Sequence, residues 1–210
     1  MTRHSRGRDA HLKDSLTQRR EPRWRPIATI SRRALPASLV SWLLHTPSLT
    51  RRLRAECCDS FRVRVLSQSW RRPLRNERMA LGMAYHEVGL VREVHLLCRQ
   101  RPWVFARTVI PVQTMTGSVR RLARLGARPL GGLLFADPSV RRGALEIASI
   151  APGHSLYGTA TGTVTGTDTD TANGAPIWGR RSVFHLDDKP LLVSEIFLSG
   201  VGEREDRTGA

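Results

Sequence analysis

Two apolar stretches separated by only four residues constrain the fold of this chain most. Residues 88–98 and 103–112 have the length and the β-branched and aromatic side chains that are typical of strands. The connection between them, residues 99–102, is too short for the crossover that two parallel strands require. These residues are therefore predicted to form an antiparallel hairpin. Residues 182–186 and 191–198, around the polar residues 187–190, predict a second one.

The rest of the chain adds weaker strands and short helices. Residues 61–65 alternate apolar and basic side chains, and residues 141–150 give a weaker strand pattern. Helical spacing and helix-start signals predict helices at residues 36–43, 49–54 and 116–126. Residues 70–87 show no pattern that assigns them. The fold class is therefore predicted to be α+β, with one antiparallel sheet and flanking helices.

Length and composition predict one folded domain with polar ends. A chain of 210 residues, 40% of them hydrophobic, can build one core of ordinary size. We expect a basic, unstructured extension over residues 1–34, the domain over residues 35–200, and an unstructured tail over residues 201–210. The Thr-rich stretch at residues 158–175 offers almost nothing apolar to bury, so it is expected to be a loop of low complexity.

The net charge of +16 raises the question of a nucleic-acid partner. Residues 1–33 hold ten Arg or Lys against three acids, so +7 of this charge lies in the extension. Of the 34 basic residues 32 are Arg, which a GC-rich coding sequence would also produce. Nucleic acid is therefore not the expected partner, except through non-specific contacts of the extension.

Other classes of protein find little support in the sequence. No apolar run approaches the roughly 18 residues of a membrane span, and no secretory signal follows the basic N-terminus, so a soluble, cytoplasmic protein is expected. A mitochondrial presequence is the alternative, against which the three acids count. Three Cys residues imply neither a zinc site nor a disulfide framework. The seven His residues show no metal-ligand spacing, and no Gly-rich phosphate loop occurs.

Arg92 interrupts an otherwise apolar strand face that it shares with Leu90, Val94 and Leu96. A guanidinium buried there must find an anion, because desolvation of an unpaired charge is costly. Its planar pair of donors suits a carboxylate. The anion can be an acidic side chain of the protein or a bound ligand, and the sequence pattern alone favours neither.

Arg107 and Glu195 are the other two charged residues predicted to be buried. If residues 99–102 form the loop, Val94 opposes Arg107, which places Arg107 on the same face as Arg92 as a second anion contact. A loop of three or five residues would place them on opposite faces. Glu195 has apolar neighbours on both faces of its strand, so it is either the partner of a buried Arg or a proton-handling group.

Several segments, taken in order, resemble the chorismate pyruvate-lyase family. They are Val91-Arg92-Glu93, Leu96-Leu97-Cys98, Pro102-Trp103, Ala106-Arg107-Thr108-Val109-Ile110-Pro111, Arg128-Pro129-Leu130-Gly131, Leu134-Phe135, Trp178-Gly179-Arg180-Arg181-Ser182 and Lys189-Pro190-Leu191-Leu192, followed by Glu195, Phe197 and Leu198. The resemblance covers residues 35–198. It implies a six-stranded antiparallel sheet that encloses a buried site, and cofactor-free conversion of chorismate into 4-hydroxybenzoate and pyruvate, the first step of ubiquinone synthesis.

The resemblance also implies roles for particular residues. Arg92 would bind the ring carboxylate, Glu195 and the backbone of Leu130 would meet the hydroxyl end of the ring, and Leu49 would supply a backbone contact. Arg107 lies in a matching segment as a second anion contact. Neither the basic extension nor the long Thr-rich stretch matches the family pattern. We further expect a monomer.

A non-catalytic sensor of small acids is the alternative function. Effector-binding domains of some transcription regulators share this fold and would also bury an Arg for a small acid. Such a regulator should carry a DNA-binding helix-turn-helix before the domain, and residues 1–34 are too short and too polar to form one.

Overall fold

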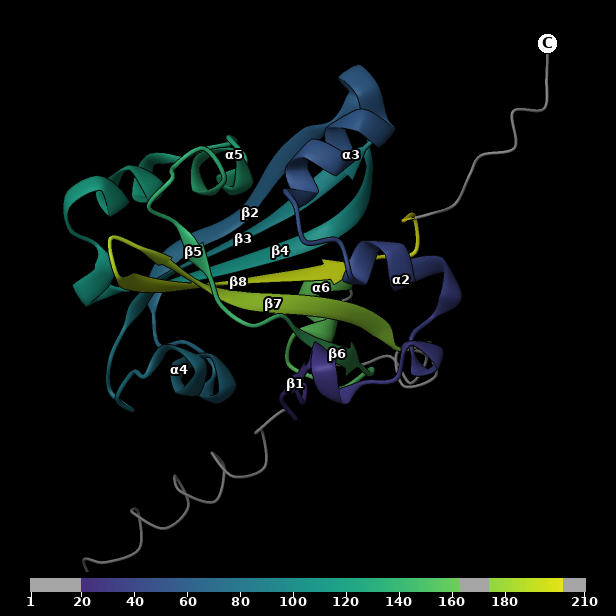
Figure 1. Ribbon diagram of the computed structural model, residues 1–210, viewed down its shortest axis with the longest axis horizontal. Helices are drawn as coiled ribbons and strands as arrows, with labels where there is room; N and C mark the ends of the chain where they lie inside the picture. Colours follow the sequence, from purple (N-terminus) through teal and green to yellow (C-terminus); the bar gives the residue numbers. More distant parts are fainter. Residues whose placement is uncertain (1–19, 163–173, 202–210) are drawn as a thin grey trace, which may run out of the picture.

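The computed structural model of the protein describes residues 20–162 and 174–201. They form one antiparallel sheet with the strand order β1-β6-β7-β8-β4-β3-β2, and β5 pairs with β7 (Figure 1). The strands are β1 (Arg25–Pro26), β2 (Arg62–Arg71), β3 (Gly89–Cys98), β4 (Arg101–Pro111), β5 (Arg141–Arg142), β6 (Glu146–Ile150), β7 (Ile177–Leu186) and β8 (Lys189–Phe197). The predicted α+β class and both hairpins are confirmed, and six of the strands are longer than two residues.

Short helices connect and cover the strands. The α-helices are α2 (Ala37–Leu43), α3 (Leu49–Cys57), α4 (Arg75–Leu81), α5 (Leu130–Leu134) and α6 (Tyr157–Thr161). The 3-10 helices are η1 (Ile27–Thr29), η2 (Arg32–Ala34), η3 (Cys58–Ser60), η4 (Val112–Thr114) and η5 (Gly117–Arg124). No helix in these two described segments is long and apolar enough to cross a membrane.

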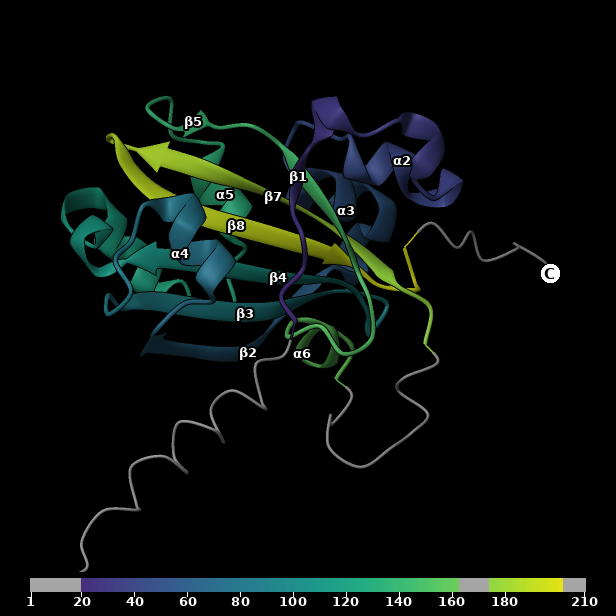
Figure 2. The same ribbon diagram turned by 90° about the horizontal axis from the view of Figure 1, so that it is seen from below.

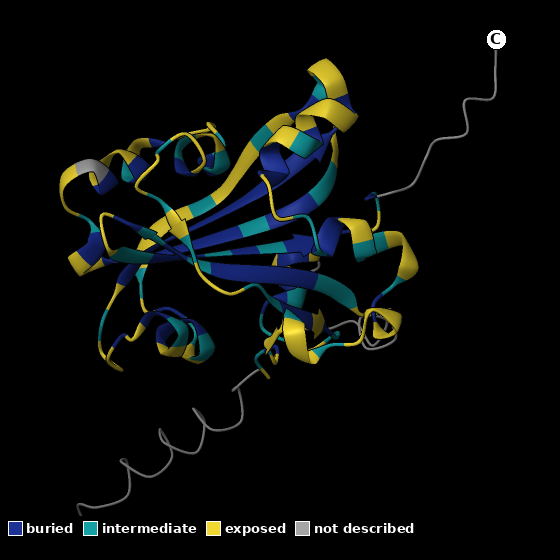
Figure 3. Ribbon diagram, viewed as in Figure 1, coloured by how far each residue is buried: buried dark blue, intermediate teal, exposed yellow. Residues whose placement is uncertain are grey.

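The helices divide between the two faces of the sheet (Figures 1 and 2). On one face, α2 and α3 cover one end of the strands, and η5 and α5 cover the other end. On the opposite face lie α4 and α6. Figure 3 shows the central strands buried between these two layers. The first face therefore carries two separate apolar clusters, and the space between them is where a ligand can lie.

Both hairpins turn over two residues rather than the four that the sequence suggests. Arg99 and Gln100 have φ of 48° and 68°, and Asp187 and Asp188 have φ of 50° and 60°. Positive φ at both central residues is the geometry of a tight turn that matches the twist of the strands, and Gly or Asn usually supplies it. Pro102 and Pro190, which we expected in the loops, lie near the first residues of β4 and β8.

The register of β3 against β4 shifts by one residue at Trp103. Leu97 pairs with Pro102 and Leu96 with Val104, which leaves Trp103 as an extra residue in β4. A bulge of this kind sends every later side chain of the strand to the other face. Arg92 consequently pairs with Thr108, and Arg107 lies on the face opposite to Arg92.

The folded region begins earlier than the expected boundary at Leu35. β1 pairs with β6, and the carboxylate of Glu21 accepts hydrogen bonds from the backbone N–H groups of Arg75 (2.8 Å) and Asn76 (2.7 Å) at the start of α4. Residues 20–34 are thus part of the domain. The predictions for residues 1–19, for most of the Thr-rich stretch and for the tail after residue 201 fall outside the described residues.

A disulfide joins Cys57, at the end of α3, to Cys98, at the end of β3. The sequence implied no disulfide framework, and this single bond was not predicted. The two Cys residues are 41 positions apart in sequence, and only the hairpin brings the end of β3 back to α3. Cys58 has an exposed, free thiol.

Candidate active site

A pocket lies on the first face of the sheet, between the two apolar clusters. Its floor consists of alternate residues of β3, β4 and β8, and its roof is formed by α3, α5 and the residues that flank α5. It encloses about 510 Å³ of space, part of it open to solvent. The lining residues are Leu49, Thr50, Val63, Arg92, Val94, Leu96, Ala106, Thr108, Pro129, Leu130, Gly131, Leu134, Phe135, Phe184, Val193 and Glu195. The pocket thus brings together four of the five predicted site residues, Arg92, Leu130, Glu195 and Leu49.

Strand register explains how Arg92 and Glu195 come to share this floor. Arg92 pairs with Thr108, which pairs with Val193 on β8. Glu195 is two residues further along β8, so it lies on the same face as Val193. Two strand spacings separate β3 from β8, which is about 10 Å across the sheet. Both side chains therefore face one space of limited width, from opposite sides.

Arg92 carries a buried charge that no acidic side chain of the described residues neutralises. The residue is 4% exposed. Its Nη2 donates to the carbonyl oxygens of Gly126 (2.9 Å) and Arg128 (3.2 Å), and its Nε has no partner. Burial lowers the pKa of the Arg92 guanidinium from its ordinary value. A carboxylate in the pocket would satisfy the free donor and neutralise the charge.

Glu195 lies at the other side of the floor, in an ion pair with Arg180. Arg180 on β7 donates from Nε to Oε2 of Glu195 over 2.6 Å, and it is 1% exposed. The Nη1 of Arg180 also donates to the carbonyl oxygens of Trp42 (2.9 Å) and His45. This arrangement fixes one oxygen of the Glu195 carboxylate and leaves the other without a donor from the described residues.

The first turns of α3 and α5 form the roof of the pocket. Leu49 and Leu130 are the first residues of these helices, where backbone N–H groups have no partner within the helix. Ser48 caps α3 by accepting from the N–H of Arg51. A Cβ on Gly131 would come within 2.8 Å of the Thr50 hydroxyl, so this glycine permits α5 to pack directly on α3.

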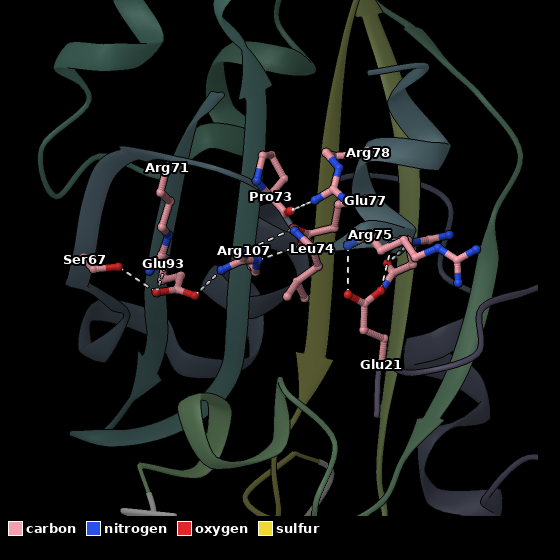
Figure 4. Close-up of polar contacts among 12 residues, drawn as sticks. Glu21, Ser67, Arg71, Pro73, Leu74, Arg75, Glu77, Arg78, Glu93 and Arg107 are labelled. Atoms are coloured by element: carbon pink, nitrogen blue, oxygen red, sulfur yellow. Dashed lines mark hydrogen bonds and ion pairs between the residues drawn. The ribbon is translucent and has the colours of Figure 1, made fainter. Parts of the chain in front are cut away.

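Arg107 is the predicted site residue that the structure places elsewhere. Its Nε and Nη2 donate to the two carboxylate oxygens of Glu77 (2.7 and 2.9 Å), and its Nη1 donates to Glu93 over 2.5 Å (Figure 4). Burial acts against its charge, but bonding to Glu77 and the charges of Glu77 and Glu93 outweigh it and raise the pKa of Arg107. The expectation that Arg107 shares a face with Arg92 is wrong, because the extra residue at Trp103 turns it to the α4 side.

Sequence reasoning missed Arg180 as part of this site. The residue appeared only within the segment Trp178-Gly179-Arg180-Arg181-Ser182, with nothing to distinguish it from Arg181. The available signal was the pairing of the last hairpin, because a two-residue turn at residues 187 and 188 places Arg180 directly opposite Glu195. Arg181 faces the other side of the sheet, where its Nε donates to Glu146 over 2.7 Å.

The fold and the pocket define a class of protein, namely α+β domains with a pocket between one face of an antiparallel sheet and short covering helices. The model of the family described as "Chorismate lyase" matches residues 20–206. The chain belongs to the chorismate lyase family.

Two relatives named chorismate pyruvate-lyases agree with this assignment. A protein of Methylococcus capsulatus named "Probable chorismate pyruvate-lyase" is 42% identical over 161 residues, which cover 77% of this chain and 94% of the relative. A protein of Azoarcus sp. with the same name is 42% identical over 178 residues, covering 84% and 89%. Among solved structures, a GntR-family transcriptional regulator from Bacillus cereus aligns with a TM-score of 0.48 at 11% identity, covering 70% of this chain and 97% of that one.

Proposed function

We propose that this protein is a chorismate lyase, which splits chorismate into 4-hydroxybenzoate and pyruvate without a cofactor. The observation that carries the proposal is the buried guanidinium of Arg92, which no acidic side chain of the described residues neutralises. It shares one pocket with the carboxylate of Glu195. Membership of the chorismate lyase family and the names of the relatives support the same reaction.

The substrate ring lies along the floor between the two charged residues. Its carboxylate accepts from Arg92, and its hydroxyl end faces Glu195. The backbone N–H groups of Leu130 and Leu49, at the first turns of the two covering helices, are the remaining donors. The apolar side chains of Val94, Ala106 and other residues of the floor and roof fit the faces of the ring.

Little covalent help is needed, because chorismate becomes aromatic when its enolpyruvyl group leaves. The bond between ring C3 and the ether oxygen breaks, and the hydrogen on C4 is lost. The hydrogen ends on the methyl group of pyruvate, and no water is consumed. The protein contributes by fixing the reacting conformation and by excluding water, so that charge on the leaving oxygen meets preorganised donors.

Glu195 has two parts in this scheme. Its Oε2 is held by Arg180, and the other oxygen accepts from the substrate hydroxyl. A carboxylate beside C4 can also receive the C4 proton and pass it on to the departing enolpyruvate.

The family further suggests a place in metabolism. We propose that the reaction supplies 4-hydroxybenzoate to ubiquinone synthesis in the cytoplasm, and that the protein acts as a monomer. Nucleic acid has no part in this activity. A product held between Arg92 and Glu195 under two helices should leave slowly, because the helices must move before it can escape.

One assay tests the activity directly. Purified protein is incubated with chorismate alone, and 4-hydroxybenzoate and pyruvate are measured together. The proposal expects both products in equal amounts, with no added metal or nucleotide, and loss of both with the Arg92→Ala variant. A folded protein that binds 4-hydroxybenzoate and forms neither product would instead be a sensor of small acids.

A further inference from the structure

Arg142 lies at the edge of the pocket and is not among the contacts proposed above for the product. The residue belongs to β5, which pairs with β7, so that Arg142 lies opposite Phe184. Its guanidinium carbon is 5.4 Å from the centre of the Phe184 ring, and Phe184 lines the pocket. Its Nε donates to the hydroxyl of Ser182 (3.0 Å), and its Nη1 donates to the carbonyl of Thr46 (2.8 Å).

Ser182 shows which side of the pocket this is. It pairs with Val193, so it continues the row of floor residues that begins at Arg92 and passes through Thr108. The guanidinium of Arg142 therefore lies just beyond the β7 edge of the floor. This is the side of the pocket on which Glu195 and Arg180 form their ion pair.

The charges at this side of the pocket do not balance. Arg180 and Glu195 neutralise one another at 2.6 Å. Arg142 is half-buried, and its Nε and Nη1 donate to neutral oxygens rather than to a carboxylate. Burial and the charge of Arg180 lower the pKa of Arg142, and the charge of Glu195 opposes them only in part. Arg92 in the pocket and Arg142 at its edge are thus two cations that form no ion pair with an acidic side chain of the described residues.

Chorismate has two carboxylates, one for each of these two cations. One carboxylate is on ring C1, the group assigned above to Arg92. The other is at the end of the enolpyruvyl group on C3, the carbon next to the C4 hydroxyl. If the hydroxyl faces Glu195, the enolpyruvyl group extends from the same end of the ring, toward the β7 edge of the floor.

We propose that Arg142 binds the carboxylate of the enolpyruvyl group, the part of the substrate that leaves as pyruvate. The proposal rests on the proposed function for the identity of the substrate. It adds the residue that distinguishes substrate from product, because 4-hydroxybenzoate keeps only the C1 carboxylate. Binding at Arg142 also holds the ether oxygen in place while the C3–O bond breaks.

Arg142 could instead be only a support for the chain around Thr46, which precedes α3. A support would affect every ligand equally, because a displaced α3 changes the roof for substrate and product alike. A binding residue would affect only ligands that carry the second carboxylate. Ligands with one and with two carboxylates therefore separate the two roles.

The test measures dissociation constants of two stable ligands, 4-hydroxybenzoate and the dianion 3-(carboxymethoxy)-4-hydroxybenzoate, together with KM and kcat for chorismate. Arg142→Ala should raise the dissociation constant of the dianion and the KM for chorismate about 10- to 100-fold, as expected for a lost charge-assisted hydrogen bond. Binding of 4-hydroxybenzoate should change less than about threefold, within the usual spread for an untouched contact. Arg142→Lys should restore part of the dianion binding.

Arg141→Ala is the matched control. It removes the same charge one residue away, from a guanidinium that is exposed and paired with Asp188. It should leave the dissociation constants of both stable ligands and the KM for chorismate unchanged. Equal losses for both stable ligands with Arg142→Ala, or no loss for the dianion, would overturn the proposal. Failure of the wild-type protein to turn over chorismate would overturn the proposed function instead, since the binding comparison does not need turnover.

Discussion

Arg92 and Arg107 lie on paired strands but on opposite faces of the sheet, and only the charge of Arg107 is neutralised by acidic side chains of the described residues. Arg107 has two buried carboxylates, Glu77 and Glu93, as partners. Arg92 has two backbone carbonyls, a free Nε and no acid among the residues described. This difference supports the proposal that Arg107 holds α4 in place and that Arg92 binds an external anion.

Substitution of Arg107 should therefore cost stability. Arg107→Met leaves the buried Glu77 without its cation and leaves Glu93 with Arg71 alone. Breaking a buried pair in this way costs about 3–5 kcal/mol. Unfolding by urea, followed by circular dichroism, measures the loss. Arg121→Met is the control, because Arg121 pairs with Asp137 at the surface and such pairs contribute about 1 kcal/mol or less. Similar values for the two variants would contradict the structural role given to Arg107.

Substitution of Arg92 should weaken ligand binding and leave stability almost unchanged. Arg92→Met removes an unneutralised charge but also two bonds to carbonyl oxygens, so the two effects on unfolding free energy oppose one another. We expect a change below about 1 kcal/mol. Affinity for 4-hydroxybenzoate should fall by at least about 30-fold, because truncating one partner of a buried charge pair costs about 2–5 kcal/mol. Calorimetric titration measures this, and binding that survived would remove Arg92 from the site.

The sequence could predict which side chains share a face within one strand. It could not predict which faces of two paired strands coincide, because that depends on their register. Alternation in residues 88–98 correctly placed Arg92 among apolar neighbours. The face of Arg107 depended on one extra residue at Trp103, and a bulge leaves no mark in the hydrophobic pattern. The turn at Arg99 and Gln100 was missed because positive φ is expected at Gly, Asn or Asp and not at Arg or Gln. Asp187 and Asp188 tolerate positive φ, but no Gly follows Asp187 to mark a two-residue turn.

Contacts between distant segments were beyond prediction. Residues 70–87 carry no clear helical stripe, and α4 is held there by polar contacts of Glu77 and Glu21 as well as by the apolar packing of Leu81. The pairing of Arg180 with Glu195 required the exact turn of the last hairpin. The disulfide required the position of Cys57 relative to the end of β3, which sequence spacing does not give.

Reduction of the Cys57–Cys98 disulfide should destabilise the protein. The bond closes a loop with a sequence separation of 41, and loops of this length are expected to contribute about 4 kcal/mol through the entropy of the unfolded chain. Thermal unfolding with and without a reductant measures the effect. Cys58→Ser should behave as wild type in both conditions, because the Cys58 thiol is free and exposed. An unchanged melting temperature on reduction would show that the bond does not form in solution.

Stability should fall in acid through Glu93. Burial raises the pKa of this carboxyl, but the Ser67 hydroxyl and the charges of Arg107 and Arg71 outweigh it and hold the pKa below its ordinary value. Because the folded pKa is depressed, its contribution is complete above the unfolded value of about 4.3 and is lost as pH falls through the folded pKa. Urea unfolding between about pH 3 and 6 should show this loss, with a shallower slope in Glu93→Gln. Substitution of the exposed Glu56 by Gln should leave the slope unchanged.

Glu195→Gln separates binding from proton handling. Gln keeps one oxygen that accepts from Arg180, and the NH2 group that replaces the other oxygen can donate to the hydroxyl oxygen of the ligand. Affinity for 4-hydroxybenzoate should therefore fall less than about tenfold, the cost of about 1 kcal/mol for one weakened hydrogen bond. Gln cannot receive a proton, so kcat at saturating chorismate should fall about 100-fold or more, as is usual when a general base is lost. Full turnover by Glu195→Gln would leave the residue a binding role only, with the C4 hydrogen then passing directly to the enolpyruvyl group within the substrate.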